Sequence, residues 1–83
     1  MKTIYKYPIE IVDKQIIKFD RSKVVHVGLD PQGTPCIWAE YCSIYPPSDH
    51  FVYIIGTGNP MPEITLRHIG SFIQGPFVWH VYI

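Results

Sequence analysis

Charged residues are scarce in this sequence: Asp, Glu, Lys and Arg together make up 17% of its 83 residues, against roughly 25% in typical soluble proteins. The formal net charge is zero. Proteins that bind duplex nucleic acid need a basic surface that displaces many counterions. The composition therefore excludes duplex nucleic acid as an expected partner, whereas one or two cations would still suffice to hold a small anion.

Long apolar runs are also missing. No stretch approaches the ~20 residues of a membrane helix, and nothing after Met1-Lys2 resembles the apolar run of a signal peptide. We therefore expect no membrane association and a cytoplasmic location. The sequence holds two cysteines, Cys36 and Cys42. On one strand they would lie about 20 Å apart at ~3.3 Å per residue, beyond disulfide reach, so we expect two free core thiols.

Patterns that signal catalysis or metal binding are absent as well. The four histidines are widely spaced and never form an H-x-H or H-x-x-x-H pair, and neither cysteine has a second ligand at metal-binding spacing. No nucleophile elbow or pair of carboxylates stands out. A hydrolase built on His80 would need an orienting carboxylate, and none lies nearby in the sequence. We expect no catalytic residue, no metal and no cofactor.

Apolar residues recur every second position or run continuously, and never follow a helical period over a useful window. This predicts an all-β protein, a small antiparallel barrel or sandwich of about six to seven short strands, in a single domain over residues 1–83. Asp30–Gly33 has the composition of a tight turn, and the prolines assign Tyr45–Asp49 to a loop. Ile9–Lys14 is either a loop or a short strand, and Glu63–His68 either one helical turn or irregular chain. The expected strands are Thr3–Tyr7 (on an edge), Gln15–Phe19, Lys23–Leu29, Cys36–Tyr41, His50–Ile55, Ile69–Ile73 and Phe77–Ile83.

The closing stretch Phe77–Ile83 is apolar at both odd and even positions, with His80 as the main interruption. A strand with one wet face alternates instead. We therefore expect this strand to be covered on both faces, either inside the core or between subunits. Few charges, 14% aromatic residues and small size together favour a homo-oligomer.

Gly56-Thr57-Gly58-Asn59 is the loop that most suggests ligand binding. Two glycines around a hydroxyl leave backbone N–H groups open to a phosphate or carboxylate, although a tight turn needs the same glycines for shape alone. Arg67 or an N-terminal lysine would supply the countercharge, and His80 would lie nearby. Trp38 would stack on a planar base. The alternatives are that His80 is a hydrogen-bonded core or interface residue and that Trp38 belongs to the core.

A series of short motifs occurs in order along nearly the whole chain. They are Tyr5-Lys6-Tyr7-Pro8, Asp13-x-Gln15, Gly33-x-Pro35-Cys36-x-Trp38-Ala39, Gly56-Thr57-Gly58-x-Pro60-x-Pro62, Ile69-Gly70-Ser71-Phe72 and Trp79-His80-Val81-Tyr82. As a set, these motifs resemble a family of short phage and bacterial proteins that form a domain of unknown function. Members of that family often carry Trp where this chain has Tyr5, and His where it has Asn59. The resemblance implies a phage-type setting, hence the cytoplasm of a host cell, and transfers no activity.

Two functions are compatible with these observations. The first is a homo-oligomeric, non-enzymatic phage protein that binds and sequesters a small nucleotide-derived signalling ligand and so counters host defence. The alternative is a protein-interaction module that inhibits a host factor through an exposed sheet edge or the Tyr45–His50 loop. Both hypotheses rest on contextual analogy as well as on the residues.

Overall fold

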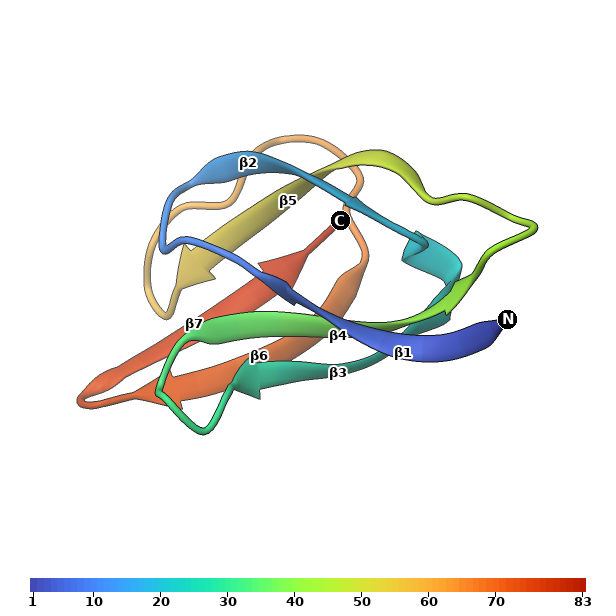
Figure 1. Cartoon of the computed structure of the whole chain (residues 1–83). Coiled ribbons are helices and arrows are strands. Elements are labelled where there is room, and N and C mark those ends of the chain that lie inside the picture. The colour runs from blue at the N-terminus through green and yellow to red at the C-terminus, as the bar shows by residue number, and fades with distance from the viewer.

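The computed structural model describes residues 1–83 and is almost entirely β (Figure 1). One 3-10 turn, η1 (Arg21–Lys23), is the only helical element. The prediction of an all-β fold with six to seven short strands is confirmed. The strands are β1 (Lys2–Pro8), β2 (Lys14–Phe19), β3 (Val24–Leu29), β4 (Pro35–Cys42), β5 (Ser48–Gly56), β6 (His68–Gln74) and β7 (Phe77–Tyr82).

The strands form two antiparallel sheets, with the orders β1-β4-β3 and β2-β5-β7-β6. Strands of the two sheets run at an angle to each other in Figure 1, as in a β-sandwich. β1 lies on a sheet edge, as its sequence predicts. β5 is long enough to serve two partners, because its first part pairs with β2 and its end pairs with β7.

The core lies between the sheets and follows the two-residue period of the strands. In β4, for example, Ile37 and Ala39 are fully buried whereas Trp38 and Glu40 are only half-buried. Burial of each large apolar side chain contributes about 1.5–3 kcal/mol. The core cluster consists of Ile9, Phe19, Val27, Ile37, Ala39, Val52, Ile54, Phe72, Val81 and Ile83.

Three local predictions need correction. β5 begins at Ser48 rather than at His50, because the prolines that break the ladder extend only to Pro47 and Ser48 pairs with Phe19. Residues 63–67 form irregular chain, one of the two alternatives predicted for Glu63–His68, but His68 already belongs to β6, which was expected to begin at Ile69. Both cysteines are free, as expected, and burial raises the pKa of the Cys36 thiol. Cys42, however, is half-buried and lies outside the core.

The closing strand is covered on one face only. β7 lies between β5 and β6, with Val81 and Ile83 in the core. The alternate positions face outward, where Val78 is 36% exposed and His80 and Tyr82 are half-buried. The prediction of cover on both faces is therefore wrong within one chain, because the two-residue period turns every second side chain away from the core. Cover of the outer face by a second subunit stays a prediction.

The turn between β3 and β4 is organised by Asp30. Its Oδ1 accepts hydrogen bonds from the backbone N–H groups of Gln32 and Thr34, both at 2.9 Å. Its Oδ2 forms an ion pair with Lys6 Nζ at 2.9 Å. The hydrogen bond from Lys6, followed by that from the Thr34 N–H, lowers the pKa of the Asp30 carboxyl below its ordinary value of 3.8.

The lowered pKa of Asp30 predicts a specific acid sensitivity. The charged carboxylate contributes stability above about pH 4, the range of the unfolded chain, and this contribution is lost as the pH falls through the lower pKa of the folded state. Asp30→Asn should therefore be less stable than wild type at pH 7, and the difference should shrink below pH 4. Urea unfolding midpoints of both proteins between pH 7 and pH 2 measure this. A difference that stays constant over that range would contradict the role of the charge.

Candidate functional site

The glycine loop predicted to hold an anion follows β5 directly. Two of its backbone N–H groups are already used: that of Thr57 donates to the Val78 carbonyl at 3.2 Å, and that of Asn59 donates to the Gly56 carbonyl at 3.0 Å. Gly58 has φ +90°, a conformation that side chains with a Cβ rarely adopt. The shape of the turn therefore explains why residue 58 is glycine. Two of the loop's backbone N–H groups already donate within the chain, so they are not free to bind an anion.

A hollow of about 420 Å³ lies beside this loop. The rings of Phe77 and Trp79 stack there, with centroids 5.6 Å apart. No basic residue lines the hollow, so it offers no countercharge to a bound anion. Its lining residues are Gly56, Thr57, Asn59, Pro76, Phe77, Val78 and Trp79.

His80 does join the glycine loop, through a row of hydrogen bonds across the outer face of the four-stranded sheet. Thr57 Oγ1 lies 2.7 Å from His80 Nε2, and His80 Nδ1 lies 2.8 Å from Ser71 Oγ. Ser71 Oγ is also 2.8 Å from His68 Nε2. Both ring nitrogens of His80 thus have partners, which matches the prediction of a hydrogen-bonded residue. Sequence reasoning identified Thr57 and His80 but missed Ser71 and His68.

Two other predicted site residues lie elsewhere. The backbone of Arg67 pairs with Ile83, five residues along the chain from Val78, which corresponds to ~16 Å of extended strand. Trp38 belongs to the other sheet, where its ring packs against His26 with centroids 5.2 Å apart. Neither residue therefore reaches the glycine loop.

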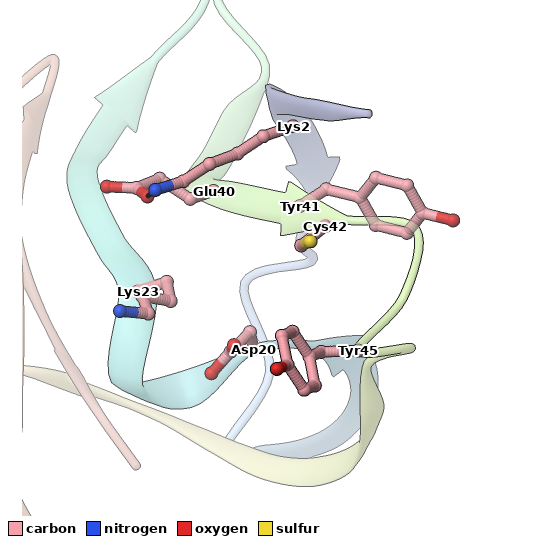
Figure 2. Close-up of a pocket in the computed structure, with 7 residues that line it drawn as sticks. All are labelled: Lys2, Asp20, Lys23, Glu40, Tyr41, Cys42 and Tyr45. Atoms are coloured by element: carbon pink, nitrogen blue, oxygen red, sulfur yellow. Dashed lines mark ion pairs between the residues drawn. The ribbon is translucent and has the colours of Figure 1, made fainter.

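A second hollow, of about 390 Å³, lies where the end of β4 meets the start of β1 and η1 (Figure 2). The β1–β4 ladder places Lys2 opposite Cys42. Tyr45 folds back onto β4, since its N–H donates to the Cys42 carbonyl at 3.1 Å. The lining residues are Lys2, Asp20, Lys23, Glu40, Tyr41, Cys42 and Tyr45.

This hollow combines both signs of charge with an aromatic ring. Lys2 Nζ pairs with Glu40 Oε1 at 3.3 Å, whereas Lys23 has no carboxylate within ion-pair distance. In Figure 2 the Tyr45 ring lies beside Asp20, while the Tyr41 ring points away from Lys23. The Tyr45 side chain is 70% exposed. An exposed ring and an unpaired ammonium group in one lining are suited to a planar, anionic ligand.

Asp20 is held in place by its neighbour in η1. Its Oδ1 accepts hydrogen bonds from the Ser22 hydroxyl at 2.7 Å and from the Ser22 N–H at 3.0 Å. These two hydrogen bonds lower the pKa of the Asp20 carboxyl below its ordinary value. Asp20 is therefore charged at neutral pH and serves as an acceptor of hydrogen bonds rather than of protons.

The sequence model of the family described as "Domain of unknown function (DUF7352)" matches residues 1–83. The chain belongs to the DUF7352 family. No curated protein and no solved structure matches it. Membership confirms the resemblance to a domain of unknown function and brings no activity with it. No helix of this DUF7352 chain is long and apolar enough to cross a bilayer.

The hollow of this DUF7352 domain was missed by sequence reasoning because its residues come from distant parts of the chain. Lys2 and Cys42 meet only through the β1–β4 pairing, which no local pattern reports. The sequence did indicate part of this hollow, through the position of its basic residues. Six of the seven basic residues lie at or before Lys23, and an N-terminal lysine was one of the two proposed countercharges.

Proposed function

We propose that this protein binds and sequesters a small nucleotide-derived ligand, without catalysis, in the hollow between β1, β4 and η1. The observation that carries the proposal is that the exposed residue Tyr45 lines the same hollow as Lys2 and Lys23. The hollow of about 390 Å³ falls within the range of small-molecule sites, about 300–1,000 Å³.

Each group has a distinct role in the proposed complex. Tyr45 stacks on the base, a contact worth about 1–3 kcal/mol per base. Lys23 and Lys2 face the phosphate, and Lys23 does so without first giving up an ion pair. Asp20 and Glu40 each have a carboxylate oxygen without a partner, which can accept a hydrogen bond from an amino group of the base.

Capture rather than turnover fits the charge state of this hollow. No histidine lines it, and the carboxyl that Ser22 holds has a pKa below its ordinary value. Such a group is a poor proton acceptor at neutral pH. In the phage-type setting that the sequence resemblance implies, capture of a host signalling nucleotide would counter host defence.

The test is calorimetry with a panel of mononucleotides, cyclic nucleotides and ADP-ribose-type compounds. We expect saturable binding of at least one compound, with the dissociation constant raised about tenfold or more in Tyr45→Ala and in Lys23→Ala. Lys18→Ala is the charge-matched control, since Lys18 is exposed on β2 and lies outside the lining. A full panel without heat or thermal shift would overturn the proposal, as would equal losses in Lys18→Ala and Lys23→Ala.

A protein-interaction module is the second candidate, because the Tyr45–His50 loop proposed for it begins at an exposed aromatic residue that follows an exposed isoleucine. Ile44 and Tyr45 are 71% and 70% exposed. Ile44 does not line the hollow, so it separates the two functions. In a ligand binder, Ile44→Ala should leave the affinity for the nucleotide within about twofold of wild type. Affinity purification from host lysate with Ile44→Ala and with Tyr45→Ala tests the interaction module. If each variant loses the same host protein that wild type retains, the result would favour this second function.

A further inference from the structure

A separate hollow of about 290 Å³ lies on the other side of η1, against the start of β6. The proposed nucleotide hollow takes Asp20 and Lys23 from the η1 region, whereas this one takes Arg21 and Ser22. The two hollows share no residue. The lining residues here are Arg21, Ser22, Val24, Arg67, His68 and Ile69.

The two arginines in this lining carry charges that no carboxylate neutralises. The ion pairs of the chain are Lys2–Glu40 and Lys6–Asp30, so neither guanidinium group has an acidic partner. Arg67 Nη2 donates a hydrogen bond to the backbone carbonyl of Arg21. That bond anchors the Arg67 guanidinium beside η1 and leaves its other N–H donors free, because arginine has five.

No acidic residue contributes to this lining. The nearest carboxylate in sequence, Asp20, is bound by Ser22 and lines the other hollow. The Ser22 hydroxyl therefore already donates its hydrogen bond to Asp20 and is not available as a donor to a ligand. His68 adds an imidazole ring to this lining: its Nε2 contacts Ser71, whereas its Nδ1 has no partner in the chain.

We infer that Arg21, Arg67 and His68 form a binding site for a phosphate group. Guanidinium groups bind phosphate through paired, charge-assisted hydrogen bonds, and two of them lie on one small concavity here. The occupant is inorganic phosphate or the phosphate of a small soluble monoester. The site is distinct from the proposed nucleotide hollow and stands whether or not that hollow binds nucleotides.

Amide chemical shifts during titration with inorganic phosphate at constant ionic strength test this site. We expect saturable shifts at Arg21, Ser22, Arg67 and His68, and none of them with chloride at the same ionic strength. Glycerol 3-phosphate should shift the same amides if the site also accepts monoesters. If it does not, the occupant is inorganic phosphate alone.

Variants distinguish a specific phosphate site from general electrostatic attraction of phosphate to the protein surface. Arg21→Ala keeps the backbone carbonyl that anchors Arg67, so it removes one guanidinium and little else. We expect Arg21→Ala and Arg67→Ala each to raise the dissociation constant for phosphate about tenfold, and Lys18→Ala to change it less than twofold. Arg67→Lys keeps the charge but loses the planar fork, and should bind less tightly than wild type. Identical shifts with chloride, or equal losses in Arg21→Ala and Lys18→Ala, would overturn the inference.

Discussion

Replacing Phe19 with alanine is expected to remove a large share of the stability of this protein. Phe19 ends β2, is fully buried, and contacts the rings of Tyr7 and His50 at centroid distances of 6.1 and 5.6 Å. Truncation of a buried Phe to Ala costs about 3–5 kcal/mol. A chain of this length has a total stability of roughly 4–12 kcal/mol, at about 0.05–0.15 kcal/mol per residue.

Urea unfolding followed by circular dichroism measures this loss. Phe51→Ala is the matched control, because Phe51 is 48% exposed and contacts Lys14 on the outer face of the same sheet. We expect a cost of about 1 kcal/mol or less for this control. If the two variants lose similar amounts of stability, the core does not lie where the structure places it.

Gly70→Ala is expected to destabilise the contact between the two sheets. A Cβ atom at Gly70 would lie 2.7 Å from the Cβ of Val27, closer than real Cβ atoms approach. Val27 is buried on β3, and Gly70 follows an irregularity in the pairing of β6 with β7. Overpacking of this kind costs typically about 1–3 kcal/mol, and sometimes more.

The double variant identifies the cause. Val27→Gly removes the Cβ that a Cβ at position 70 would meet, together with both γ-carbons, so the double variant should lose less than the sum of the two single losses. Gly28→Ala is the control, because its new Cβ would meet only the flexible side chain of His26, at 2.9 Å. Strictly additive losses for Gly70→Ala and Val27→Gly would show that β3 and β6 do not pack as described.

The strands could be predicted because their signals are local. Alternation in Thr3–Tyr7 and the turn residues Asp30–Gly33 depend on near neighbours only, and β1 and the β3–β4 turn follow them closely. The limit of this reasoning appears in Phe77–Ile83. Continuous apolar composition indicates that a strand has little contact with water, but the composition does not say whether its second face is covered by the same chain.

The surroundings of the glycine loop could be predicted only in part, because they depend on strand pairing. His80 and Thr57 were both identified, yet their contact arises from the β5–β7 register. Trp38 was expected near the glycine loop, but the sheet order places it in the other layer, and Trp79 lines that hollow instead. Arg67 was expected to provide countercharge; its partner in a basic cluster, Arg21, is 46 residues away in sequence.

The position of a bound nucleotide tests the central proposal most directly. With protein saturated by the tightest compound of the panel, intermolecular nuclear Overhauser effects should connect the base protons to the Tyr45 ring. The amide shifts should be largest at Lys2, Lys23, Cys42 and Tyr45. Contacts confined to the Gly56–Asn59 loop or to Arg21 and Arg67, or no contacts at all, would contradict binding between β1, β4 and η1.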